Sequence, residues 1–289
     1  MLRKALAAIV VLLAVSPALA APNAVVEALQ APAWLERGGK RLPLAVGTQL
    51  RNGDEVTTGV ESRALFRLAD GSRVKLGENG SLKFDSLAVR RGDGRVLRAT
   101  LRVLEGAFRF TTDAVSGARY RREIDVQFTT LTAGIRGTDI WGRNFGDREV
   151  VVLIEGRITV SRAGASVEMQ EAGTYYQAPV SGEPSVQRIP ADLLNEWAQQ
   201  TEIRKGGGAQ SPGGQWKLDV ARFDNQEAAL ALYDSLRRDG YSVRILPRSV
   251  DSGHIYHVRL GGFSSRAEAQ VLGERLRQVY PGISPEASR

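Results

Sequence analysis

Cysteine is absent from the 289 residues of this chain, and histidine occurs only twice, as His254 and His257. Without thiols the chain has no disulfide framework, no thiolate metal site and no cysteine nucleophile. The two histidines lie three residues apart, so an extended strand would place their rings on opposite faces, where they cannot chelate one metal ion. No serine lies in a nucleophile elbow, and no pair of carboxylates is placed to act as general acid and general base. We therefore expect no metal, no cofactor, no catalytic residue and no enzymatic activity.

Long hydrophobic runs are also missing after the first twenty residues. Arg3 and Lys4 precede an uncharged, mostly aliphatic stretch over residues 5–15, and an Ala-x-Ala site ends at Ala20. Such a stretch spans about 16 Å as a helix, roughly half of a hydrocarbon core of about 30 Å. Residues 1–20 are predicted to be a cleavable signal peptide, with an uncleaved N-terminal anchor as the alternative. The mature chain is expected in the periplasm, without a membrane span.

Blocks of like charge are missing as well. The formal net charge of +7 falls to +5 without Arg3 and Lys4. It is spread over residues 21–205, with 26 basic and 23 acidic residues, and residues 212–289, with 11 and 9. Neither part has the run of five like charges that is typical of nucleic-acid-binding tails. We expect no nucleic-acid partner, while a mild positive excess suits an anionic surface.

Residues 47–178 alternate between apolar and polar side chains in short runs. One run covers residues 63–68 and is followed by a turn at 69–72, and another covers 150–154 and is followed by Glu155-Gly156. Period-two alternation is typical of strands with one buried face. The predicted fold is multi-domain, beginning with an all-β domain over residues 21–180 that is built of stacked hairpins or is sandwich-like.

Several motifs of this region resemble the FecR-like periplasmic domain family. They are the Asp70-Gly71-Ser72 turn, Leu104-Glu105-Gly106, an A-x-x-R-G-T element within residues 128–139, and residues 155–160. The resemblance implies an all-β module that, in its best-known members, passes a signal from an outer-membrane receptor to an anti-sigma segment. No such cytoplasmic helical segment or membrane span is found here, so only the periplasmic module is expected to carry over. The glycines at residues 134–138 favour a strand corner over an anion-binding loop.

Residues 181–214 are predicted to connect two domains. Pro190 suits a helix start, and apolar residues recur at near-helical spacing up to Ile203, which predicts one helix that packs on the first domain or leads out of it. The glycine-rich segment 206–214 has the composition of a flexible linker with a reach of roughly 15–18 Å. The last domain is predicted over residues 215–289.

This last domain contains an internal repeat. Residues 217–223 align with residues 257–263, and each copy is a strand ending in phenylalanine before a helix, with Asn225 and Ser265 as expected N-caps. The order βαββαβ predicts an α+β ferredoxin-like domain whose two helices share one face of the sheet. Trp216 and Tyr256 are expected to pack toward the helices. The alternate strand residues would form the open face, namely Lys217, Asp219, Arg222, Arg244, His257 and Arg259.

The repeat is similar to the SPOR (sporulation-related repeat) family. The matching elements are the corners at residues 220–223 and 260–263 and the strand at residues 256–261. The resemblance implies binding of peptidoglycan through the open face, with a preference for glycan strands stripped of their stem peptides. Asp219 stands where the family usually has glutamine, and Arg222 stands where it has a small residue. The six open-face residues are the predicted glycan-binding residues.

The sequence therefore predicts an exported periplasmic protein that is not an enzyme. Its SPOR-like domain would bind glycan strands of the cell wall and tether the FecR-like domain there, with cell division sites as one location, and an envelope protein would be the partner of the first domain. The alternative is an envelope signalling or assembly adaptor in which both domains bind proteins. A wall hydrolase would need a carboxylate or histidine cleft that the sequence does not offer.

Overall fold

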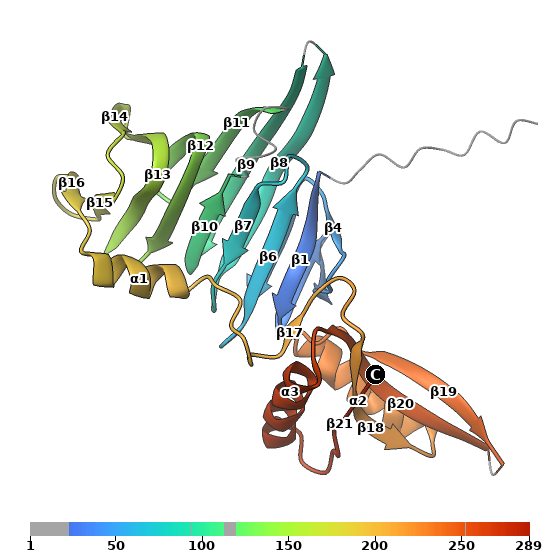
Figure 1. Cartoon of the computed structure of the whole chain (residues 1–289). Helices are drawn as coiled ribbons and strands as arrows, with labels where there is room; N and C mark the ends of the chain where they lie inside the picture. Colours follow the sequence, from blue (N-terminus) through green and yellow to red (C-terminus); the bar gives the residue numbers. More distant parts are fainter. Residues whose placement is uncertain (1–22, 93, 113–119, 252) are drawn as a thin grey trace, which may run out of the picture.

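The structure is a computed structural model that describes residues 23–92, 94–112, 120–251 and 253–289. A β-rich N-terminal domain is followed by a smaller α+β domain (Figure 1). The predicted signal peptide, residues 1–20, lies outside the described residues. Within the described part of the chain, no helix is both long and apolar enough to cross a membrane.

The N-terminal domain is built almost entirely of strands, as the period-two alternation predicted for residues 47–178, and four further strands lie outside that range. They are β1 (Ala24–Gln30), β2 (Ala33–Arg37), β3 (Lys40–Pro43), β4 (Gln49–Leu50), β5 (Asp54–Thr58), β6 (Arg63–Leu68), β7 (Arg73–Leu76), β8 (Ser81–Gly92), β9 (Gly94–Glu105), β10 (Ala107–Thr111), β11 (Tyr120–Gln127), β12 (Leu131–Asn144), β13 (Arg148–Arg162), β14 (Ala165–Met169), β15 (Thr174–Pro179) and β16 (Ser185–Arg188).

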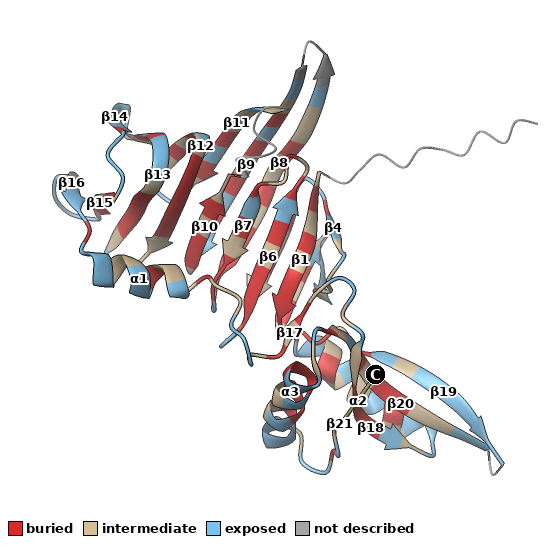
Figure 2. Cartoon of the chain, in the orientation of Figure 1, coloured by how far each residue is buried: buried red, intermediate tan, exposed pale blue. Residues whose placement is uncertain are grey.

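These strands form two layers that face each other across one core. One layer runs β3-β2-β5-β8-β9-β11, and the other runs β4-β1-β6-β7-β10. Strands β12 and β13 pair with each other along their length and continue both layers. Phe66 of β6 and Phe84 of β8 meet edge to face, with ring centroids 5.3 Å apart. The inner faces are fully buried (Figure 2), so the predicted sandwich-like fold class is confirmed.

Strand β12 passes from one layer to the other at Gly137. Its first half pairs with β11 and its second half with β10, and its register with β13 shifts at this point. Gly137 has φ +111°, and a Cβ on Gly156 opposite would lie 2.4 Å from the Gly137 carbonyl oxygen. Nearby, the Thr138 N–H donates to Thr112 Oγ1 over 2.9 Å. The glycines thus serve a strand corner, where only glycine fits.

Helix α1 (Ala191–Gln199) covers the outer face of the second layer. It begins directly after Pro190, and its Trp197 stacks on the buried Trp141 of β12 at a centroid distance of 4.8 Å. Phe145 and Tyr175 complete the aromatic cluster. The helix therefore packs on the first domain, one of the two expected arrangements, and it ends before the apolar Ile203.

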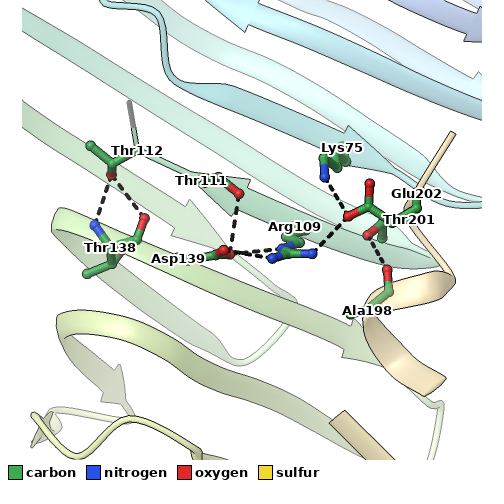
Figure 3. A network of polar contacts seen from close by, with 9 residues as sticks. All are labelled: Lys75, Arg109, Thr111, Thr112, Thr138, Asp139, Ala198, Thr201 and Glu202. Atoms are coloured by element: carbon green, nitrogen blue, oxygen red, sulfur yellow. Dashed lines mark hydrogen bonds and ion pairs between the residues drawn. The ribbon is translucent and has the colours of Figure 1, made fainter. Parts of the chain in front are cut away.

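The chain after α1 is fixed to the sheet by an ionic network (Figure 3). The Glu202 carboxylate accepts hydrogen bonds from Lys75 Nζ (2.5 Å) and Arg109 Nη1 (2.8 Å). Arg109 also donates to both oxygens of Asp139, over 2.9 and 2.7 Å. The network joins β7, β10 and β12 to the segment that leads to the second domain.

The C-terminal domain has the predicted βαββαβ order. Its sheet runs β21-β18-β20-β19, all antiparallel, and both helices lie on one face. Asn225 Oδ1 and Ser265 Oγ cap the helices as expected. Each accepts a hydrogen bond from the backbone N–H three residues later, over 2.8 and 3.2 Å. The elements are β18 (Trp216–Phe223), α2 (Gln226–Arg238), β19 (Arg244–Val250), β20 (Gly253–Phe263), α3 (Arg266–Val279) and β21 (Glu286–Ser288).

The glycine-rich segment 206–214 is held by both domains, so its expected flexibility is wrong. Within it, β17 (Ala209–Gln210) pairs with β1 on one side and with Phe263 of β20 on the other. The buried Glu268 carboxylate on α3 accepts from the backbone N–H groups of Gly206, Gly208 and Ala209 over 2.7–2.9 Å. We call residues 206–214 the strap. Glycine composition favoured flexibility, but one buried carboxylate orders three backbone N–H groups at the entropy cost of a single side chain, which outweighs it.

Replacing Glu268 with glutamine is expected to loosen the strap. An amide keeps the shape but loses the charge and one acceptor, which leaves buried N–H groups unsatisfied at a cost of about 2 kcal/mol. We expect that loss in urea unfolding, together with faster amide exchange at Gly208 and Ala209. Glu274→Gln, on the exposed side of the same helix, is the matched control. Equal stability and exchange in the two variants would contradict the role of Glu268.

Candidate functional site

The open face of the C-terminal sheet carries all six predicted glycan-binding residues. The intervening Leu218, Val220, Val258 and Leu260 are fully buried beneath the helices. Trp216 and Tyr256 are partly buried against the same core, as expected. The open-face residues lie on β18 (Lys217, Asp219, Arg222), β19 (Arg244) and β20 (His257, Arg259). Their common face is confirmed, and their contact with glycan stays a prediction.

Asp219 is the hub of an ionic cluster on this face. Its side chain is almost inaccessible, with a residue exposure of 3%. Arg259, directly opposite on β20, donates from Nε to one carboxylate oxygen and from Nη2 to the other over 2.9 Å. His257 Nδ1 lies 3.1 Å from the same carboxylate, and Arg222 Nη2 lies 3.5 Å from it. The cluster explains the aspartate here, because a buried carboxylate needs such partners.

Protonation of Asp219 is disfavoured by these neighbours. Burial alone would raise the pKa of its carboxyl, but hydrogen bonds from Arg259 and His257 and their charges outweigh burial, and the pKa lies below its ordinary value. Reciprocally, the hydrogen bond to Asp219 raises the pKa of Arg259 against the opposing effect of burial. Asp219 and Arg259 therefore neutralise each other.

Lys217 and Arg244 differ from the other cations of the open face. Neither has an ion-pair partner among the described residues, whereas Arg222 also pairs with Glu286 of β21. Lys217 lies opposite Gly261, and Arg244 lies opposite Arg259. These two positive charges are the ones free to meet an anionic group.

A groove of about 420 Å³ lies at one end of the open face. Its volume falls within the range of about 300–1,000 Å³ that is usual for ligand sites. Of the predicted residues it includes Lys217, Arg244 and Arg259, while Asp219, Arg222 and His257 lie outside its lining. The rest of the lining comes from three parts of the chain. They are the strap (Gln210, Ser211, Pro212, Gly213, Gly214), the strands β19 and β20 with a residue shortly before β19 (Ser242, Leu246, Gly261, Gly262), and the first domain (Ala45, Val46).

Sequence reasoning missed several residues of this groove. Leu246 could have been found, because it lies two residues after Arg244 on the same strand and so shares its face. Ala45 and Val46 carry no signal in the sequence, because about 170 residues separate them from β18. Only the packing of the two domains brings them to the site.

Comparisons with known proteins identify two families in the chain. A family model described as FecR protein matches residues 54–159, and one described as SPOR domain matches residues 212–285. No curated protein matches. Two crystal structures of a candidate anti-sigma factor from Parabacteroides distasonis share 13% and 14% identity, each with a TM-score of 0.40 over 78% of this chain and 91% and 90% of theirs. A likeness of this strength says nothing about function. The chain contains a FecR domain followed by a SPOR domain, as the sequence motifs predicted.

Proposed function

We propose that the SPOR domain binds glycan strands of peptidoglycan and thereby tethers the FecR domain to the bacterial cell wall, without enzymatic activity. The observation that carries the proposal is the groove on the open face, which is lined by the unpaired Lys217 and Arg244 together with an apolar side chain, Leu246. The SPOR match supports peptidoglycan as the ligand, and the FecR match supports a role in the cell envelope. The periplasm is the proposed location, with residues 1–20 as the signal peptide.

The chemistry of the groove suits a glycan strand. Sugar rings offer apolar faces for Leu246 and hydroxyls for the polar groups that border it. Each muramic acid unit also bears a lactyl group, whose carboxylate is free once the stem peptide has been removed. Lys217 and Arg244 can pair with such carboxylates, which would favour stripped strands over intact ones.

The six predicted residues are then proposed to have different roles. Lys217 and Arg244 are proposed to contact the ligand directly, and Arg259 borders the groove while it pairs with Asp219. Asp219 is a positioning residue that holds Arg259 and His257 in place across the two strands. Arg222 contacts Glu286 near the edge of the sheet and is proposed to act at the rim.

Retention of the full mature chain on purified sacculi tests this function. We expect more protein to sediment after an amidase has removed the stem peptides, and less as salt screens the carboxylates. A protein without glycan affinity that is matched in charge serves as the control. Failure to sediment with both kinds of sacculi would refute the proposal.

The FecR domain is proposed to bind an envelope protein, as its family match suggests. In the alternative adaptor function both domains would bind proteins, and glycan would make no difference. Crosslinking in the periplasm separates the two, because the adaptor predicts a saturable protein partner for the SPOR domain that persists when sacculi are digested. For the division of the chain we propose 21–180, 181–214 and 215–289, with α1 packed on the first domain. Action at division sites is part of the same proposal.

A further inference from the structure

We propose that the FecR domain closes one end of the glycan groove, so that the site takes the end of a glycan strand instead of an internal stretch. This inference rests on the proposed binding of glycan by the open face. It adds a specificity that the SPOR domain alone does not contain, because part of the site comes from the other domain.

The groove lies at the end of the SPOR sheet that adjoins the first domain. Lys217 is near the start of β18, Arg244 starts β19, and Gly261 is near the end of β20. Because neighbouring strands are antiparallel, these three positions lie at the same end of the sheet. Strand β17 connects that end to β1. Ala45 and Val46, which precede β4, reach the groove from the first domain.

Together with Ala45 and Val46, the strap forms a wall that closes this end of the groove. Residues 210–214 line the groove, and they are pinned to the end of β20 by two hydrogen bonds. Gln210 Nε2 donates to the Gly261 carbonyl over 2.6 Å, and the Ser211 N–H donates to the Gly262 carbonyl over 2.8 Å. The strap therefore cannot swing aside without breaking contacts with the sheet that binds the ligand.

Further contacts fix the first domain against the SPOR domain. The Trp34 Nε1–H donates to the Arg238 carbonyl over 2.9 Å, and the Ala33 N–H donates to the Gly240 carbonyl over 3.2 Å. Arg275 of α3 pairs with Glu61 at 3.3 Å. Since these contacts come from different elements of both domains, Ala45 and Val46 keep a set position at the groove.

The described residues leave the opposite direction along the sheet open. Strand β19 is exposed along most of its length and extends with β20 away from the first domain (Figure 2). A glycan that runs parallel to the strands over the open face can leave on that side, but it meets Ala45, Val46 and the strap on the other. An internal stretch needs two exits, whereas a strand end needs only one.

The number of binding sites per unit of sugar tests the inference. Stripped glycan strands are prepared at two mean lengths that differ fivefold, and the full chain is titrated against equal amounts of total sugar. Recognition of ends predicts a binding capacity about fivefold higher for the shorter strands. A capacity that follows total sugar and ignores length would overturn the inference. Absence of binding to both preparations would refute the proposed function itself and the inference with it.

Substitutions in the wall provide a second test. Ala45→Glu and Val46→Glu place a carboxylate beside that of the ligand, and we expect at least tenfold weaker binding of the shorter strands. Val180→Glu is the matched control, because Val180 is 70% exposed and lies between β15 and β16 of the same domain. Val46 packs partly against the core, so Val46→Glu could disturb the fold, whereas Ala45 is not among the residues packed there. A thermal unfolding curve of each variant shows whether it is folded. Folded wall variants that bind like Val180→Glu would overturn the inference.

Discussion

The double charge reversal Lys217→Glu/Arg244→Glu is expected to weaken binding of the full chain to stripped sacculi by about 100-fold. Both side chains line the groove, and neither has an ion-pair partner among the described residues. Each reversal replaces attraction to a ligand carboxylate by repulsion, and about tenfold per position corresponds to about 1.4 kcal/mol. Equilibrium sedimentation with sacculi at low salt measures the effect.

Arg266→Glu/Arg277→Glu is the control for this experiment. It changes the net charge of the SPOR domain by the same amount, but the two arginines are exposed on α3, on the opposite face of the sheet. We expect a loss of at most about threefold, through long-range electrostatics alone. Equal loss in the two double variants would show that binding depends on overall charge and not on the groove. Arg259 is a poor choice here, because its reversal would place two carboxylates together at Asp219.

Asp219→Ala is expected to destabilise the SPOR domain by about 3–5 kcal/mol. The substitution leaves Arg259 and His257 without the carboxylate that holds them, and removal of one partner from a buried ion pair typically has this cost. Urea unfolding monitored by far-ultraviolet circular dichroism measures the loss. Asp234→Ala, an exposed aspartate on α2, should change stability by less than about 0.5 kcal/mol. An equally small effect at Asp219 would contradict its role in the cluster.

The same cluster predicts how stability depends on pH. The pKa of Asp219 is below its ordinary value in the folded chain, so the ionised carboxylate stabilises the fold. That contribution is fully present above the unfolded-state pKa of about 3.9 and is lost as pH falls through the lower folded-state value. We therefore expect the difference in stability between the wild-type chain and Asp219→Asn to shrink as pH falls below about 4. A difference that stays constant down to pH 2 would contradict this linkage.

Local patterns in the sequence determined most of the secondary structure. Period-two alternation predicted the strands, and Asn225 and Ser265 predicted the helix starts, because caps and alternation depend on near neighbours. The internal repeat predicted which residues share the open face, since right-handed crossovers put both helices on one side. The motifs also predicted both domain families. Composition was a poor guide at the strap, because its glycines favoured a flexible chain.

Contacts between distant segments decided what the sequence left open. Asp219 reads as a departure from a family pattern, and only the register of β18 against β20 shows that Arg259 neutralises it. Glu268 drew no expectation from the sequence, yet its carboxylate holds the strap. The wall at Ala45 and Val46 exists only because the domains dock. The sequence alone thus determined two domains and an open basic face. The tertiary structure decided which cations are free and where the groove ends, because ion pairing and domain docking join residues that lie far apart in the chain.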